Sequence, residues 1–260
     1  MTKDNVKKVV SIDFDYWIPE DLVLDLGHQE NSLFITTLWN MRLSTYASLE
    51  TKLCISPDEV PQPMSMGKFF RDRKMKINRS SSPIAAAESH ASIVHFLEGM
   101  EKVDIFTIDA HHDFGYGDKD KDDCGSWVRT LANADVLNSV HLFYPMWRKK
   151  YDYDWNELAQ KQADEWKSQG IDVNVSFGLD DFPEGLHVDK LFVCRSGAWS
   201  PPWTDDDFIM MFSCLMMNLK MSNYTAYTYN RLDEFRRHID WGAVREGREA
   251  TRQFMENAKH

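Results

Sequence analysis

Hydrophobic residues in this chain gather in short runs, separated by longer segments in which apolar positions have helical spacing. The runs are about five to seven residues long and partly β-branched, and apolar runs of this length are typical of buried strands. The sequence therefore predicts strands at 6–12, 103–108, 140–144, 173–177 and 190–194.

The segments between these runs favour helices, because their apolar residues recur every three or four positions. Ser82-Pro83 resembles an N-cap followed by proline at the first helical position, and Gly170 ends a later helix. Residues 57–82 are polar and contain proline, which predicts an irregular excursion. The predicted helices are 32–49, 84–100, 125–137, 155–169, 205–217 and 232–258.

Alternation of strands and helices predicts an α/β fold with three layers, in which a mainly parallel β-sheet carries helices on both faces. No segment rich in Ser, Gly or Pro divides the chain, so we expect a single domain over residues 1–260. In sheets of this kind, functional sites form at the carboxyl ends of the strands.

The composition of the chain limits the kinds of molecule that we expect it to bind. Lys and Arg number 30 against 41 Asp and Glu, a net charge of −11, which argues against nucleic-acid binding and against an anionic membrane surface. No apolar segment reaches the length of a membrane span, and the start has no secretory apolar core. The cysteines, Cys54, Cys124, Cys194 and Cys214, have no CxxC spacing. We expect a cytoplasmic protein with reduced cysteines, acting on a small-molecule substrate, and homo-oligomerisation stays open.

The most specific chemistry follows the predicted strand 103–108, in the run Asp109-Ala110-His111-His112-Asp113. Along an extended chain, Asp109, His111 and Asp113 point to one side and His112 points to the other. Oxygen and imidazole ligands grouped at a strand end suit a divalent metal ion. The small Ala110 lets the turn close tightly.

Two further groups strengthen the prediction of a metal site. Asp13 and Asp15 follow the first predicted strand and are two positions apart, so their carboxylates face the same way. Taken alone they also fit an Asx-type turn. His90, in Glu88-Ser89-His90, falls on the helix predicted at 84–100. Carboxylates that bridge two ions about 3.5–4 Å apart would require acidic residues from more than one strand.

These motifs resemble those of the arginase/deacetylase (ureohydrolase-like) superfamily. The run from Asp109 to Asp113 is similar to its central metal motif, and Ser11-Ile12-Asp13-Phe14-Asp15 is similar to its Ser-x-Asp-x-Asp strand. Over about residues 85–150 the chain is similar to a poorly characterised arginase-like branch. The resemblance implies an arginase-like fold and a pair of metal ions, usually Mn²⁺. It implies one ion held by His90, Asp109, Asp113 and Asp13, and another by His111, Asp109, Asp13 and Asp15, with Asp109 and Asp13 bridging.

The chain departs from the arginase pattern in two respects. The Asp13/Asp15 strand comes before the Asp109 strand rather than after it, so either the chain is rearranged around the same site or Asp180-Asp181 supplies the missing ligands. Gly125-Ser126-Trp127 stands where arginases place a histidine for proton transfer. We therefore expect arginine itself to be a poor substrate.

The implied reaction is hydrolysis of a C–N bond in a guanidino or amide compound by a metal-bound hydroxide. Asp113 and His112 are the candidate catalytic residues beside the metals, with His112 either supporting His111 or moving a proton. Trp127, Arg195 and Trp199 are candidate substrate-binding residues. The loop that holds Arg195 and Trp199, residues 195–203, fits a packed loop equally well.

Two other classes of function remain open. In a phosphatase of the haloacid dehalogenase type, Asp13 would be the nucleophile and Asp15 the acid, with Asp180-Asp181 as a later motif. Trp17 stands where that class usually has Thr or Val, and the Asp109 cluster would have no role. The other class is a non-catalytic metal-binding protein of the same fold.

Overall fold

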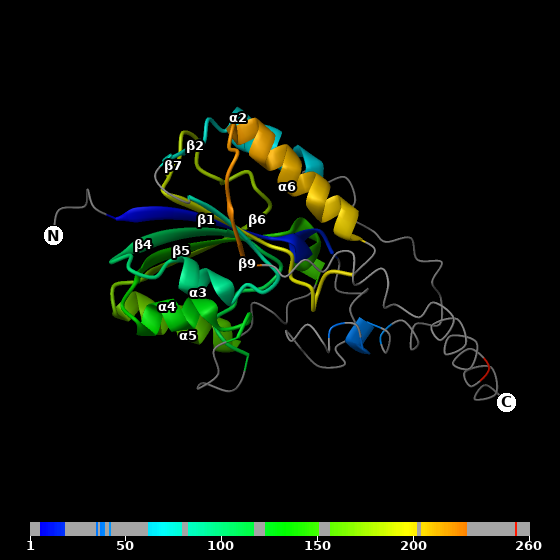
Figure 1. Ribbon diagram of the computed structural model, residues 1–260. Coiled ribbons are helices and arrows are strands. Elements are labelled where there is room, and N and C mark those ends of the chain that lie inside the picture. Colours follow the sequence, from blue (N-terminus) through cyan, green and yellow to red (C-terminus); the bar gives the residue numbers. More distant parts are fainter. Residues whose placement is uncertain are drawn as a thin grey trace.

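The computed structural model describes residues 6–18, 35, 37–39, 42, 62–79, 83–116, 123–150, 157–201, 204–227 and 253. Within these ranges, seven parallel strands form a central sheet in the order β6-β5-β4-β1-β8-β3-β9 (Figure 1). The strands are β1 (Lys7–Asp13), β3 (Ile84–Ala87), β4 (Val103–Ile108), β5 (Leu137–Tyr144), β6 (Asp172–Phe177), β8 (Lys190–Cys194) and β9 (Thr225–Tyr227). A separate parallel pair joins β2 (Lys76–Ile77) to β7 (His187–Val188).

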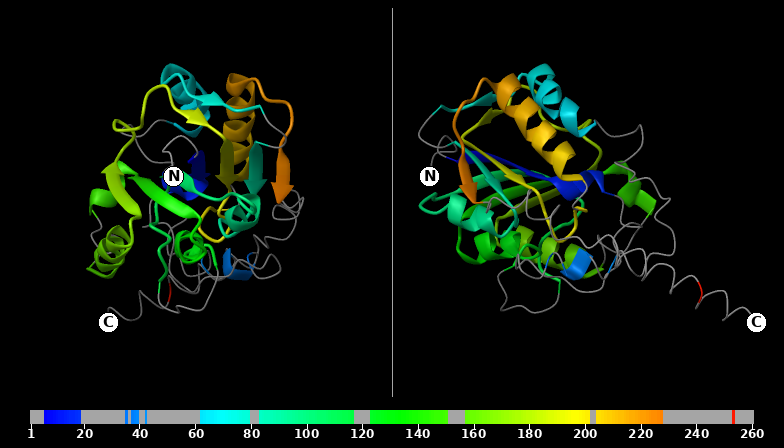
Figure 2. Two further views of the ribbon diagram at one scale, coloured as in Figure 1. Left: turned by 90° about the vertical axis from the view of Figure 1, so that its left-hand side faces the viewer. Right: turned by 45° about the vertical axis from the view of Figure 1, so that its right-hand side comes forward.

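Helices cover both faces of the sheet, as Figures 1 and 2 show. On one face lie α2 (Met66–Asp72) and α6 (Asp205–Leu219). The other face carries α3 (Ser92–Phe96), α4 (Trp127–Asn133) and α5 (Glu157–Ser168). The predicted three-layer α/β architecture is confirmed.

The central strands are largely apolar because helices bury them on both sides. In β1, Val10 and Ile12 join the core beneath α2 and α6, and Val9 joins the core beneath α3, α4 and α5. All three side chains are fully buried. Polar residues that interrupt this pattern include Ser11 in β1 and Thr107 in β4, both of which are buried.

The prediction of a helix at 84–100 is wrong. Ile84–Ala87 forms β3, which pairs with β8 and β9, and only Ser92–Phe96 is helical. Three alanines favour a helix when taken alone, but here they are buried in a strand that pairs with β8 on one side and β9 on the other. Pro83 precedes the strand, where its carbonyl accepts a hydrogen bond from the Leu191 amide.

The other predicted helices and strands differ less from the structure. The helix predicted at 125–137 is shorter, because β5 already begins at Leu137. The expected excursion at 57–82 contains α2 and β2 in its described part. The short strands β7 and β9 were not predicted. The helix predicted at 232–258 lies outside the described residues except for Gln253, and the described residues within 32–49 are helical.

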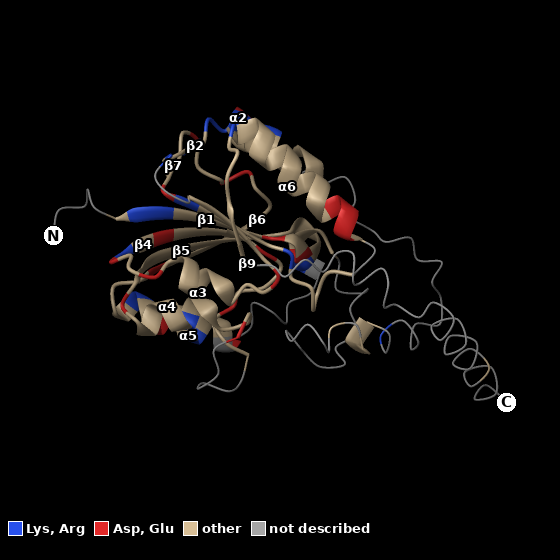
Figure 3. Ribbon diagram, viewed as in Figure 1, with Lys and Arg blue, Asp and Glu red and all other residues tan. Residues whose placement is uncertain are grey.

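Acidic residues gather at the start of α6, the red segment of that helix in Figure 3. Three of them, Asp205–Asp207, open α6, where negative charge interacts favourably with the helix dipole. In the described part of the chain, no helix combines the length and apolar character that a membrane crossing needs.

Candidate metal centre

Three strands bring the predicted ligands to one edge of the sheet. Asp13 ends β1 and Asp109 directly follows β4. These two strands are paired neighbours with Ile12 opposite Ile108, so the two aspartates leave the sheet at the same level. His90 follows β3, which lies beyond β8 in the sheet. The segment before His90 is a strand of the sheet rather than the predicted helix, which explains why His90 reaches the aspartates.

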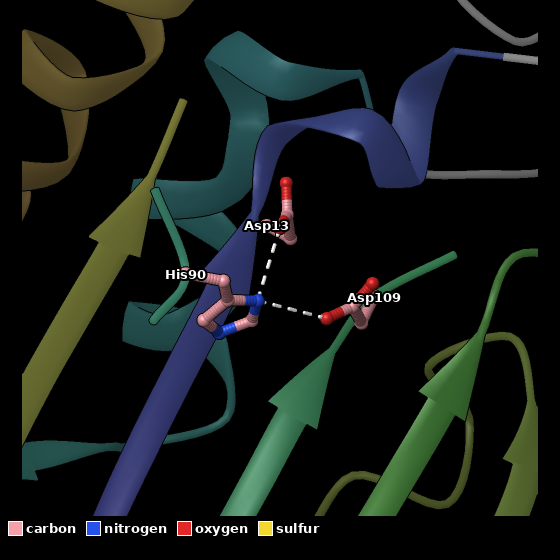
Figure 4. Close-up of side chains that lie close together, drawn as sticks. All are labelled: Asp13, His90 and Asp109. Carbon is pink, nitrogen blue, oxygen red and sulfur yellow. Dashed lines mark ion pairs between the residues drawn. The ribbon is translucent and has the colours of Figure 1, made fainter. Parts of the chain in front are cut away.

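His90 lies among three carboxylates, two of which, Asp13 and Asp109, are drawn in Figure 4. Its Nδ1 atom is 3.0 Å from Asp13 Oδ2, 3.1 Å from Asp109 Oδ2 and 3.3 Å from Asp113 Oδ2. Its side chain is 1% exposed, and Asp109 is buried to the same extent. One atom from each of Asp13, His90 and Asp109 lies within 4.8 Å of the others, a spacing that one metal ion can span.

A second group of ligand atoms adjoins the first. His111 Nδ1 is 2.9 Å from Asp15 Oδ2 and 3.9 Å from Asp109 Oδ1. Atoms from Asp15, Asp109 and His111 lie within 4.8 Å of one another. Asp109 thus belongs to both groups, with Oδ2 toward His90 and Oδ1 toward His111. The His111 side chain keeps 16% of its surface exposed, so this group is the more accessible of the two.

The donor set fits a cation better than it fits a network of hydrogen bonds. His90 Nδ1 and Asp109 Oδ2 are fully buried, yet neither makes a hydrogen bond of good geometry. Metal–ligand bonds of about 2.0–2.2 Å place neighbouring octahedral ligands about 3 Å apart, close to the 3.0–3.3 Å separations around His90. Buried polar atoms without partners are uncommon, and an ion between them would satisfy both.

Ser11 orients the His90 ring. Its Oγ atom is 2.7 Å from His90 Nε2. If Nε2 carries the proton and donates to Ser11, the Nδ1 lone pair faces the carboxylates, which is the tautomer a metal ligand needs. The ring also packs between Phe192 and Trp127, with ring centroids 5.7 and 4.6 Å away. Sequence reasoning gave Ser11 no role of its own, although it opens the Ser-x-Asp-x-Asp motif.

Crowded negative charge shifts the protonation of the cluster. Burial, followed by the charges of Asp15 and Asp109, raises the pKa of Asp13 to about 7. Burial and the charges of Asp113 and Asp15 raise the pKa of Asp109 to about 8. Burial alone lowers the pKa of His90, but the close carboxylates of Asp109, Asp113 and Asp13 raise it well above its usual value. Without a cation, the cluster therefore holds protons in place of positive charge.

Trp127 fixes Asp113. The indole Nε1 donates a hydrogen bond of 2.5 Å to Asp113 Oδ2, and the Val128 amide donates to the Asp113 carbonyl. Asp113 has a left-handed backbone, with φ of 56°, a conformation that non-glycine residues hold only when their surroundings impose it. Trp127 is 1% exposed. Its position beneath the cluster favours a supporting role over direct contact with a substrate.

The remaining predicted site residues lie around the cluster. His112 is buried, accepts a hydrogen bond from the Phe114 amide through Nδ1 and stacks on Tyr116. Trp199 is close to the cluster, with its ring centroid 5.2 Å from that of His111. Arg195 is buried and bonded to Glu88 and Asp205, contacts that the sequence did not indicate because the three residues are far apart along the chain.

The alternative acidic pair lies elsewhere. Asp180 and Asp181 are exposed after β6, and Asp181 accepts a hydrogen bond from Ser176. Two strands, β5 and β4, separate β6 from β1. Asp13 and Asp15, rather than Asp180 and Asp181, supply the acidic groups beside Asp109.

Neither models of known protein families, nor curated proteins, nor solved structures give a match to this chain. The functional argument accordingly rests on the chemistry of the cluster. That chemistry is a buried Asp/His site able to hold a divalent metal ion.

Proposed function

We propose that this protein is a metal-dependent hydrolase that uses two divalent cations, with Mn²⁺ preferred, to cleave a C–N bond of a guanidino or amide compound. The observation that carries the proposal is the position of Asp109, whose carboxylate belongs to both groups of candidate ligand atoms. A carboxylate shared in this way suits a pair of ions about 3.5–4 Å apart. The preference for Mn²⁺ follows from the predominance of carboxylate oxygen among the ligands.

In this proposal, His90, Asp13 and Asp113 hold one ion, His111 and Asp15 hold the other, and Asp109 lies between them. The distances of 3.0, 3.1 and 3.3 Å around His90 Nδ1 support the first set. The 2.9 Å separation of His111 from Asp15 supports the second. The resemblance of these motifs to the arginase/deacetylase superfamily supports the same six ligands, and it adds Asp13 as a second residue that bridges the two ions.

When bound, such a pair of ions supplies Lewis-acid activation of water and of an sp² carbon. The chain's own residues have other tasks. Trp127 holds Asp113 in place through its indole N–H. The backbone amide of Phe114 occupies His112 Nδ1, which leaves Nε2 as the atom through which His112 would move a proton. The partial exposure of His111 and its contact with Trp199 favour substrate entry on that side.

The test begins with the metal content of the protein purified without added metal, followed by titration of the metal-free protein with Mn²⁺, Zn²⁺ and Mg²⁺. We expect about two ions per chain and hydrolysis of at least one member of a panel of guanidino and amide compounds, with arginine a poor substrate. A generic phosphate ester is assayed in parallel. Metal binding without turnover would indicate a non-catalytic metal-binding protein. Phosphatase activity that survives Asp109→Asn would contradict the proposal.

A further inference from the structure

Exposed apolar side chains gather around α6. Among the described residues, six large hydrophobic side chains are exposed, and five of them, with exposed fractions of 41–68%, lie on α6 or beside it. These five are Met64, Ile209, Met210, Met217 and Tyr224. Met64 belongs to a 3-10 helix, η4 (Pro63–Ser65), that contacts α6, and Tyr224 packs its ring against Phe212 of α6. Single exposed apolar residues are ordinary, whereas a group of this kind marks a surface that another molecule covers.

The exposed residues of α6 include a stripe that runs from one end of the helix to the other. Its members are separated alternately by four and three positions and are Asp206, Met210, Ser213, Met217 and Lys220. The last of them is the residue that ends the helix. Phe208, Met211 and Leu215 are buried in the core and hold α6 on the sheet. A stripe with an average spacing of 3.5 residues is the pattern by which one helix packs along another.

The stripe is complementary to itself when two copies of α6 run antiparallel. Ser213 lies at its middle, equally far in sequence from Asp206 and from Lys220. A two-fold axis at Ser213 would place Met210 of one copy beside Met217 of the other, and Asp206 beside Lys220. The small side chain of Ser213 would let the two helices approach closely at the axis. The same surface thus supplies both halves of the contact.

The two ends of α6 carry charges of opposite sign. Its first turn contains Asp206 and Asp207, whereas Lys220 and Arg71, which donates a hydrogen bond to Asn218, are cations at its other end. Asp206 also interacts within its own chain, so the pairing requires only that its charge lies at this end of the helix. An antiparallel pair brings opposite charges and opposite ends of the helix dipoles together, and a parallel pair brings like charges together. The acidic first turn and the net charge of −11 disfavour an anionic membrane as the partner.

We propose that this protein forms a two-fold symmetric dimer in which the α6 helices of two copies pack antiparallel. Met210 and Met217 of both copies form the apolar centre of the interface, and Met64, Ile209 and Tyr224 widen it. The inference does not rest on the proposed function. A stripe on one helix is smaller than a typical interface, which buries about 800 Å² on each partner. We therefore expect a reversible dimer with a dissociation constant of about 1–100 µM.

Sedimentation equilibrium of the full chain, over concentrations that bracket this range, measures the dissociation constant. Ser213→Glu places two like charges at the axis, so we expect the constant to rise about 10-fold or more. Ser168→Glu is the matched control, because Ser168 is an exposed serine of α5, on the other side of the sheet. We expect it to leave the dissociation constant unchanged.

A second variant tests the direction of the helices. Lys220→Glu brings like charges together in an antiparallel pair, but in a parallel pair it only exchanges one pair of like charges for another. We expect Lys220→Glu to raise the dissociation constant about 3-fold or more. Lys167→Glu is the control, because Lys167 is an exposed lysine in the last turn of α5.

Wild-type protein that stays monomeric at every concentration would overturn the inference, and this measurement needs no variant to fold. A dimer that Ser213→Glu weakens no more than Ser168→Glu does would overturn it as well. Weakening by Ser213→Glu but not by Lys220→Glu would exclude the antiparallel arrangement. Monomeric protein that instead co-sediments with vesicles of phosphatidylcholine and phosphatidylserine would assign this surface to a membrane.

Discussion

Asp109 lies in both groups of candidate ligand atoms, whereas Asp15 lies in one. If two ions bind as proposed, Asp15→Asn should lower the metal content from about two ions to about one per chain. Asp109→Asn should reduce the metal content to nearly none and abolish turnover, because both ions lose a ligand. Metal content is measured by elemental analysis after gel filtration. Equal losses in the two variants would contradict a shared role for Asp109.

Trp127 offers a second test at the scale of one residue. Trp127→Phe removes the indole N–H that holds Asp113 Oδ2 but keeps an aromatic ring against His90. Loss of a partner that orients a metal ligand should weaken metal binding by about 10- to 100-fold. Trp166→Phe is the matched control, because Trp166 is buried in the same core and packs on Phe114. Calorimetric titration with Mn²⁺ measures the affinity of both variants. Equal affinities would contradict the role of Trp127 in holding Asp113.

Residue patterns predicted the part of the site that is local in sequence. Asp109, His111 and Asp113 follow one strand, and Asp13 and Asp15 follow another. The extended backbone assumed for both groups is absent, because Phe14–Trp17 is a 3-10 helix and Asp113 has a left-handed backbone. The role of Ser11 could not be predicted, because it depends on His90, which is 79 positions away. The contact of Arg195 with Glu88 spans 107 positions. Pairings of this kind appear only when the order of the strands is known.

Among the elements, β3 shows why sequence patterns were insufficient. Its residues, Ile-Ala-Ala-Ala, have helical propensity and no alternation, because both faces of the strand are buried. The small side chains of Ala85 and Ala87 lie in the core that α3, α4 and α5 cover. The strands with larger apolar side chains, β4 and β8, begin and end where they were predicted. Propensity is therefore informative where it agrees with packing and misleading where a buried strand consists mainly of alanine.

The contact of α2 with α6 gives a prediction at this scale. A Cβ added at Gly67 would lie 2.6 Å from the Cys214 carbonyl oxygen and 2.8 Å from Asn218 Nδ2. Gly67→Ala should therefore destabilise the fold by about 1–3 kcal/mol, since the helices must separate. Lys68→Ala, at the exposed neighbouring position, is the control. Chemical denaturation measures both. A Gly67→Ala variant as stable as the control would show that α2 and α6 can separate without a loss of stability.

At the scale of the whole molecule, the cluster makes stability depend on pH. The pKa values of Asp13 and Asp109 rise from 3.8 to about 7 and about 8, and the pKa of His90 rises above 6.5. Between about pH 5 and pH 8 the metal-free native state therefore binds protons that the unfolded chain has released. The free energy of unfolding should fall as the pH rises through this window.

Saturating Mn²⁺ should reverse this trend, because the metal replaces protons on the cluster and binds more tightly at higher pH. Thermal unfolding from pH 5 to pH 8, with and without chelator, measures both slopes. Metal-free protein that became more stable with rising pH would show that the cluster is not protonated in the native state.

The order of strands in the sheet also governs when the metal can bind during folding. The candidate ligands span residues 13 to 113, and β8, at residues 190–194, lies between the strands that carry Asp13 and His90. A chain still leaving the ribosome thus has all its ligand residues early, but the sheet that holds them together is incomplete until β8 has been synthesised. Parallel pairings at such separations close slowly, because a long loop must be ordered first. Metal uptake would then report completed folding, and an excess of cation should slow unfolding without accelerating folding.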